Sequence, residues 1–154
     1  LQDPKNLHEH HIVVQKIKDK MLEKSPQVQI GETGIMALKN VFHLRTLLST
    51  VDTSNSLIEW AKHLHPTPAL GGQPSKAALD FLRVNEKHER GLYAAPLGLI
   101  DAQGDGTLIV AIRSALFDGK TCYAYAGCGI VAASDCQAEF DETKIKLKTI
   151  IEAL

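Results

Sequence analysis

Residues 92–126 read LYAAPLGLIDAQGDGTLIVAIRSALFDGKTCYAYA, and this stretch decides the fold class. Its first part, 92–100, predicts a strand, DAQGDG at 101–106 predicts a hairpin turn, and 107–115 predicts the returning strand. A second turn at 117–120 leads into a third predicted strand at 121–126. Because strands joined by tight turns pair antiparallel, the stretch predicts an antiparallel meander.

Helices are predicted on both sides of this meander from apolar residues at helical spacing. They cover residues 4–24, 54–64, 75–87 and 136–153, with caps expected at Ser54 or Asn55, at Ser75, and at Ser134 or Asp135. A short strand is expected at 27–30, and 40–50 favours a strand while leaving a helix open. The segment 65–74, HPTPALGGQP, predicts irregular structure because proline and glycine dominate it. Antiparallel strands mixed with helices predict an α+β fold.

Composition narrows the class of protein. The chain has 154 residues, enough for one domain, with 44% apolar residues and a net charge of −1. This charge gives no reason to expect nucleic acid or an anionic membrane as a partner. Three cysteines without CxxC spacing argue against a disulfide framework and a zinc site, and favour reduced thiols in the cytoplasm.

The last predicted helix carries Glu139, Glu142 and Lys146 on one narrow stripe beside its apolar face. Two carboxylates and an ammonium at this spacing suit a magnesium ion and an anionic ligand. A solvated surface with a Glu142–Lys146 pair explains the same spacing, and both interpretations stay open.

Other candidates are weaker when taken one at a time. Glu9 lies in a HEHH run that lacks the HExxH spacing of zinc helices. The run from Gly127 to Ala132 matches GxGxxA without the expected helix, although its glycines suit backbone contact with an anion. Arg113, in an apolar strand, suits either exposure or carboxylate binding. His43 is interpreted as a structural histidine.

Seven motifs in order resemble one known family. They are KNLHEH, FHLRT, LHPTPALGG, ERGLYAAPLG, VAIRSA, YAGCGIV and SDCQAEFDETKIK, which together span nearly all of the chain. This series resembles the C-terminal half of the chorismate-utilising enzymes, which include anthranilate, aminodeoxychorismate, salicylate and isochorismate synthases. HPTPA and RGLYAAPLG are most similar to isochorismate synthases of menaquinone or siderophore biosynthesis.

The resemblance implies a role for each matched residue. Glu9 and Glu142 match Mg²⁺-binding glutamates, and Glu139 matches an acid that reaches the metal through water. Substrate-binding groups are implied at Arg113, Gly127, Lys146, Ala69 and Leu70. His43 matches a histidine near the substrate ring, in a supporting catalytic role. Cys128 and Cys136 depart from the usual family residues, alanine and often proline, but both are small.

The resemblance also implies what the chain does. Residues 1–154 are expected to form the C-terminal part of a chorismate-binding domain, an antiparallel sandwich with flanking helices. The parent enzyme is expected to convert chorismate to isochorismate with Mg²⁺. The family's general base and general acid lie upstream, so this chain alone is expected to be inactive. Another chorismate enzyme, or a non-catalytic fragment that binds a partner, remains an alternative. Self-association, or binding to the missing N-terminal half, is expected from uncovered apolar sheet surface.

Overall fold

Four two-stranded antiparallel ladders and five helices make up the part of the chain that this computed structural model describes, residues 4–37 and 42–154. The helices are α1 (Pro4–Leu22), α2 (Leu57–Leu64), α3 (Pro68–Gly71), α4 (Ser75–Asn85) and α5 (Cys136–Ile151). The strands are β1 (Gln29–Ile30), β2 (Gly34–Ala37), β3 (Phe42–Arg45), β4 (Leu48–Ser49), β5 (Pro96–Ile100), β6 (Gly106–Val110), β7 (Ser114–Asp118) and β8 (Thr121–Tyr125). The predicted α+β class is confirmed.

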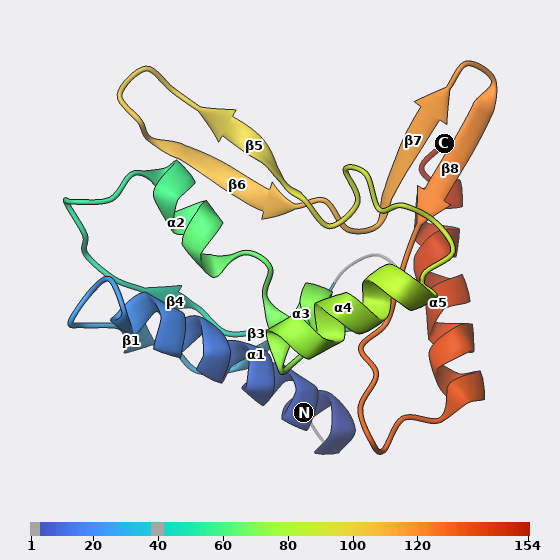
Figure 1. The fold of residues 1–154 in the computed structure, drawn as a ribbon, viewed down its shortest axis with the longest axis horizontal. Helices are drawn as coiled ribbons and strands as arrows, with labels where there is room; N and C mark the ends of the chain where they lie inside the picture. The colour runs from blue at the N-terminus through green and yellow to red at the C-terminus, as the bar shows by residue number, and fades with distance from the viewer. Residues whose placement is uncertain (1–3, 38–41) are drawn as a thin grey trace.

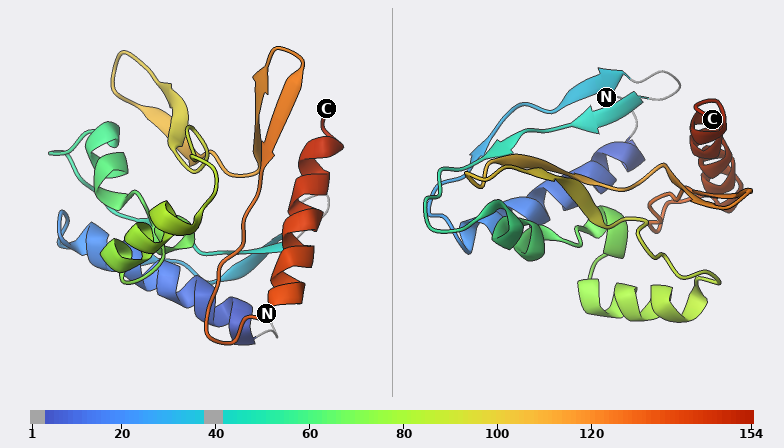
Figure 2. Two further views of the ribbon diagram at one scale, coloured as in Figure 1. Left: turned by 45° about the vertical axis from the view of Figure 1, so that its right-hand side comes forward. Right: turned by 90° about the horizontal axis from the view of Figure 1, so that it is seen from above.

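The elements form two connected groups. Helix α1 packs against α2 and α3, and β1–β4 and β2–β3 pair beside it. The hairpins β5–β6 and β7–β8 rise from the same side of the molecule, and α5 lies alongside β8 (Figures 1 and 2). The first helix and the last helix thus come from opposite ends of the chain and frame the region between them.

The predicted hairpin at 92–115 forms, and local hydrogen bonds explain its turn. The Asp101 carboxylate accepts hydrogen bonds from the backbone N–H groups of Gln103, at 2.9 Å, and Asp105, at 3.0 Å. Gly104 adopts φ +92°, a conformation that glycine reaches without steric cost. The resulting register places Leu97 opposite Ile109.

The prediction of one continuous strand at 107–115 is wrong. The pairing of this hairpin ends at Ala111, which exchanges backbone hydrogen bonds with Ala94 and Ala95, both at 2.9 Å. Arg113 then takes φ +50°, in the left-handed region, and β7 begins at the next residue. A strand cannot continue through that conformation, so one apolar run supplies strands to two separate hairpins.

Helix starts differ from the predicted caps in two places. Ser56, rather than Ser54 or Asn55, caps α2, and it forms a capping box with Glu59. Helix α4 has Pro74 at its cap position without a side-chain hydrogen bond, so Ser75 is its first helical residue. The Asp135 cap of α5 is confirmed, because its carboxylate accepts from the Ala138 N–H at 2.9 Å.

Three further boundaries differ from the sequence prediction. Residues 68–71 form a single helical turn, α3, inside the segment predicted to be irregular, because Pro68 suits the first turn of a helix. Strand β2, which begins at Gly34, lies in a segment for which the sequence analysis predicts no element. Strand β5 begins at Pro96 rather than at 92, and of the predicted strand at 40–50, residues 40 and 41 lie outside the described residues.

The described residues bury little apolar surface. Among them, the apolar residues that are buried are Met21, Ala94 and Ile150. Large apolar side chains on the hairpins remain exposed, including Leu97 and Leu99. No helix within residues 4–37 and 42–154 combines the length and apolar character needed to cross a bilayer.

Candidate site for a metal and an anionic ligand

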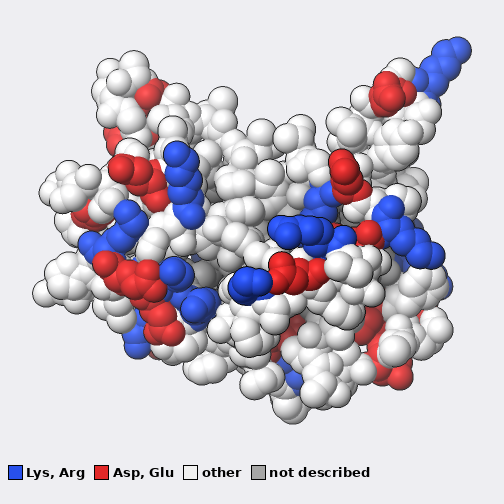
Figure 3. Space-filling view, in the orientation of Figure 1, with Lys and Arg blue, Asp and Glu red and all other residues white. Residues whose placement is uncertain are grey.

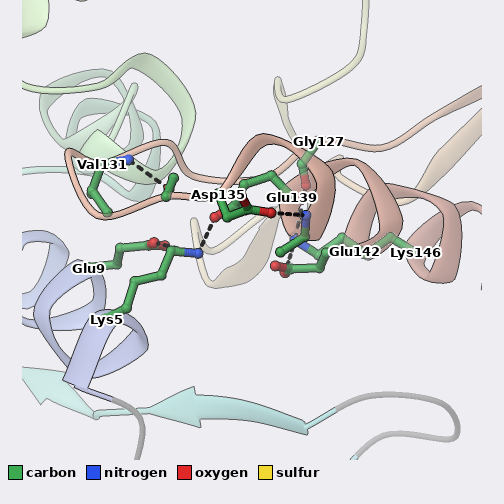
Figure 4. A network of polar contacts seen from close by, with 10 residues as sticks. Lys5, Glu9, Gly127, Val131, Asp135, Glu139, Glu142 and Lys146 are labelled. Carbon is green, nitrogen blue, oxygen red and sulfur yellow. Dashed lines mark hydrogen bonds and ion pairs between the residues drawn. The ribbon is translucent and has the colours of Figure 1, made fainter.

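Helix α5 presents the predicted stripe to the region between the two terminal helices (Figure 4). Glu139 is only 4% exposed, which is rare for a carboxylate unless it has partners. Glu142 and Lys146, one and two turns further along, are half-buried and form an ion pair at 2.7 Å. The shared stripe is therefore partly enclosed rather than a solvated surface along its whole length.

Helix α1 brings Glu9 and Lys5 to the same region. The Lys5 ammonium lies 3.4 Å from the Glu9 carboxylate and donates to the Glu139 carboxylate across 134 residues of sequence (Figure 4). Glu9 Oε1, the atom that Lys5 reaches at 3.4 Å, and Glu139 Oε2 are both buried, and neither accepts a hydrogen bond of good geometry from the described residues. Buried polar atoms without such a hydrogen bond are unusual, and two on facing carboxylates suggest room for a further cation.

The protonation state of Glu139 follows from its surroundings. Burial raises the pKa of this carboxyl, but hydrogen bonds from Lys5 and Ser134 together with the Lys5 charge more than offset burial. The pKa of Glu139 therefore lies below its usual value, and the group is an anion near neutral pH. Burial, followed by the Glu139 charge, raises the pKa of the Cys128 thiol, so Cys128 stays protonated beside it.

The loop after β8 contains Gly127 and Gly129 and is called the glycine loop below. The Lys146 ammonium donates to the Gly127 carbonyl at 3.0 Å. A Cβ at Gly127 would lie 3.0 Å from the Tyr93 hydroxyl, and a Cβ at Gly129 would lie 2.8 Å from Glu9 Oε2. Both glycines thus allow close approach of backbone to a functional side chain.

Arg113 and His43 meet at the start of β7. The Arg113 guanidinium contacts the His43 ring across 70 residues of sequence, and Arg113 Nε is buried with no hydrogen-bond partner among the described residues. Burial, then the Arg113 and Lys146 charges, lower the pKa of His43, so its imidazole is neutral near pH 7. Residues other than glycine adopt a positive φ mostly where the surrounding structure requires it, and this is one such place.

Ala69 and Leu70 lie on α3, and a hydrogen bond joins Leu70 to Arg90. The Leu70 carbonyl accepts from Arg90 Nη1 at 2.7 Å, and Arg90 also pairs with Glu86 through two hydrogen bonds of 2.7 and 2.6 Å. The Arg90 guanidinium lies over the Tyr93 ring, 6.0 Å from its centroid. Tyr93, whose hydroxyl faces Gly127, therefore links α3 to the glycine loop.

The sequence analysis gave no role to Lys5, Arg90 or Tyr93. The spacing of Lys5 and Glu9 is a visible i,i+4 pair, but nothing in the sequence indicates that Lys5 also contacts Glu139. Arg90 and Tyr93 lie inside the RGLYAAPLG motif, whose spacing alone gives no clue that they join α3 to the loop. Sequence reasoning therefore found the carboxylates but not the groups that hold them.

The predicted site lies apart from two hollows on the described residues, one bordered by Lys16 and His63 and the other by Leu7 and His10. None of the predicted site residues lines either hollow. The described residues also contain no cluster of three His, Cys, Asp or Glu side chains close enough to hold a metal ion by themselves.

Comparison with known proteins decides the family. The sequence profile described as Chorismate binding enzyme matches residues 1–154. The chain belongs to this family of chorismate-binding enzymes. Isochorismate synthase MenF of Bacillus subtilis is 44% identical over 156 residues, which is all of this chain and 33% of that protein. The salicylate biosynthesis isochorismate synthase of Pseudomonas aeruginosa is 40% identical, again over 100% of this chain and 33% of its own length.

A solved structure of the same family confirms the fold. DhbC of Bacillus anthracis, assigned as a 2,3-dihydroxybenzoate-specific isochorismate synthase, is 33% identical with a TM-score of 0.93. The match covers 99% of this chain and 42% of DhbC. The described elements are thus part of a chorismate-binding fold, and the chain spans about a third of the length of the curated relatives given above.

Proposed function

We propose that this chain is the C-terminal part of an isochorismate synthase, the part that holds chorismate and Mg²⁺. One observation carries the proposal: anionic and cationic groups lie side by side at the place where α1, α5 and the glycine loop meet. Glu9 and Glu139 supply carboxylates, while Arg113 and Lys146 supply positive charges that act together with burial, the larger cause, to lower the pKa of His43. A ligand with two carboxylates, such as chorismate, suits such a divided site.

The carboxylates fit a magnesium ion. Mg²⁺ prefers oxygen ligands and is usually held by one or two carboxylates together with substrate and water, so it needs no cage of three protein groups. The buried carboxylate oxygens Glu9 Oε1 and Glu139 Oε2 are of the right kind. Glu9 and Glu142 would hold the ion, with Glu139 acting through water. The bound ion would neutralise one substrate carboxylate.

The other groups would bind and orient the rest of the substrate. Arg113 and Lys146 would pair with the second carboxylate, and Gly127 would let backbone approach it. Ala69 and Leu70 would lie beside the ring, held in place by Arg90. His43, kept neutral, would offer a hydrogen bond near the ring without adding charge.

The reaction needs groups that this chain is not expected to provide. Conversion to isochorismate adds water at one ring carbon while hydroxyl leaves from another, which calls for a general base and a general acid. The family resemblance assigns both to the upstream half. We therefore expect the isolated chain to be inactive. The whole enzyme would act in the cytoplasm, in a menaquinone or a siderophore pathway.

A chimera tests this function. This chain would replace the matching third of Bacillus subtilis MenF, and products from chorismate would be identified by chromatography with and without ammonia. Isochorismate in both conditions supports the proposal, whereas anthranilate or aminodeoxychorismate formed from ammonia contradicts it. Turnover by the isolated chain would contradict the expected division of roles.

The chimera also permits a matched test of Arg113. Arg113→Gln should lower kcat/KM by at least about 30-fold, because it removes one partner of a buried charge pair with the substrate. Arg83→Gln is the control, since Arg83 is exposed on α4 and forms an ion pair with Asp80 at 3.7 Å. Equal effects of the two substitutions would argue against substrate binding at Arg113.

A further inference from the structure

Lys5 contacts both Glu9 and Glu139, two of the carboxylates to which the proposed function gives a role in metal binding. Its ammonium lies 3.4 Å from Glu9 and contacts Glu139 more closely still. The Glu139 side chain is 5% exposed, whereas the Lys5 and Glu9 side chains are each 25% exposed. The partly exposed lysine thus reaches a buried carboxylate (Figure 4).

One ammonium does not fully neutralise this pair. Two carboxylates share the single positive charge of Lys5, and each has a buried oxygen that accepts no hydrogen bond of good geometry from the described residues, Glu9 Oε1 being the atom 3.4 Å from Lys5. A divalent cation would bring twice the charge to the same oxygens, and the interaction energy scales with the product of the charges. A monovalent ion would bring no more charge than Lys5 already does.

We propose that Lys5 is the internal competitor of Mg²⁺ for Glu9 and Glu139, and that it sets the affinity of this site and its preference for divalent cations. The inference rests on the proposed metal role of these glutamates. Binding of Mg²⁺ requires the ammonium to withdraw toward solvent, where it remains protonated. The long, flexible lysine stem allows this movement without a change in α1.

Calorimetric titration of the 154-residue chain with Mg²⁺ alone tests the proposal. Lys5→Met keeps the length of the side chain and removes its charge, so it should bind Mg²⁺ about three- to tenfold more tightly than the unmodified chain. Lys5→Arg should bind Mg²⁺ more weakly, because a guanidinium holds carboxylates through a rigid fork. Na⁺ should not compete measurably with Mg²⁺ in any of these proteins.

Lys20→Met is the matched control. Lys20 lies on the same helix and pairs with an exposed glutamate, Glu23, at 3.0 Å, so its loss should leave Mg²⁺ affinity unchanged.

Thermal unfolding gives a second readout. In a chelator, Lys5→Met should unfold at a lower temperature than the unmodified chain, because its carboxylates then lack a counter-ion. Saturating Mg²⁺ should raise the unfolding midpoint of Lys5→Met by more than it raises that of the unmodified chain.

The outcomes separate this inference from the proposed function. Unmodified chain that binds Mg²⁺, with Lys5→Met binding equally or more weakly, would overturn the role of Lys5 and leave the metal site standing. Absence of Mg²⁺ binding in both proteins would overturn both. If Lys5→Met does not fold, Lys5→Gln replaces it. The Lys5 side-chain ¹⁵N signal of the unmodified chain should also shift on Mg²⁺ addition, and an unmoved signal would count against displacement.

Discussion

At the scale of single residues, Gly129 offers a way to move one carboxylate without disturbing the fold. A Cβ there would come within 2.8 Å of Glu9 Oε2, which is the far end of a flexible side chain and can move at little cost. Gly129→Ala should therefore change the free energy of unfolding by no more than about 1 kcal/mol, since surface changes without strain are mild. The displaced carboxylate should lower Mg²⁺ affinity by about tenfold, as measured by calorimetry.

Gly34→Ala is the control for Gly129→Ala, because a Cβ at Gly34 would meet nothing within 4 Å. It should leave both stability and Mg²⁺ affinity close to those of the unmodified chain. A Gly129→Ala protein with unchanged affinity would argue that Glu9 is not a metal ligand. Loss of stability in Gly129→Ala alone would instead show that the loop, and not the carboxylate, yields to the added methyl group.

The residues also show what sequence can predict about the site. Helical spacing and family motifs mark Glu9, Glu139 and Lys146, whose roles in a site stay a prediction. The structure places Glu139 and Lys5 together, and Arg113 and His43 together, across 134 and 70 residues of sequence. Such contacts depend on how helices and hairpins pack, and periodicity within one element carries no information about them.

At the scale of elements, the start of α2 gives a test of local stability. The Glu59 N–H donates to the Ser56 hydroxyl at 3.3 Å, and the Ser56 N–H donates to the Glu59 carboxylate at 2.7 Å. Ser56→Ala should lower the free energy of unfolding by about 1 kcal/mol, the usual cost of losing an N-cap. Ser54→Ala is the control, because the hydrogen bond from Ser54 to Asp52 uses the backbone N–H, which the substitution keeps. Equal destabilisation in chemical denaturation would contradict the capping box.

The same capping box predicts a pH dependence. The Ser56 backbone N–H and hydroxyl hold the pKa of Glu59 below its usual value of 4.5. A lowered folded-state pKa stabilises the protein at pH values above the unfolded-state pKa, and this stabilisation is lost as pH falls below about 4.5. Glu59→Gln should therefore flatten part of the decline in stability between neutral and acid pH. If denaturant titrations show the same loss of stability at acid pH in Glu59→Gln and in the unmodified chain, the charge of Glu59 contributes nothing to stability.

The prediction of element boundaries was wrong where several neighbouring residues are equally suited to begin or continue an element. Ser54, Asn55 and Ser56 are all good caps, and only the Glu59 three residues later selects Ser56. The break at Arg113 lies inside an apolar run that predicts an unbroken strand, since arginine rarely takes a positive φ. Strong periodicity and turn signals, in α1, α5 and the turn at 101–106, were sufficient to predict the element and its type.

At the scale of the molecule, the exposed hairpins suggest that this chain covers its apolar faces by association. Leu97 and Leu99 are two residues apart on β5 and therefore lie on the same face of the strand. Ile109 lies opposite Leu97, so all three share one face of the two-stranded ladder. They are 60%, 84% and 60% exposed. An isolated two-stranded hairpin is only marginally stable in water. The surface between the two hairpins also carries few charged side chains on the face shown in Figure 3.

Leu99→Lys tests whether this face drives association. Burying a leucine side chain contributes about 1.5–3 kcal/mol, so a lysine there should shift the monomer–oligomer equilibrium toward the 16.8 kDa monomer in sedimentation velocity. Val84→Lys adds the same charge at an 81% exposed position on α4, and should change association much less. In the MenF chimera, Leu99→Lys should reduce soluble yield and activity, because the remainder of the enzyme would cover the same face. An unmodified chain that stays monomeric at all concentrations, or equal effects of the two lysines, would show that this face is not the one used.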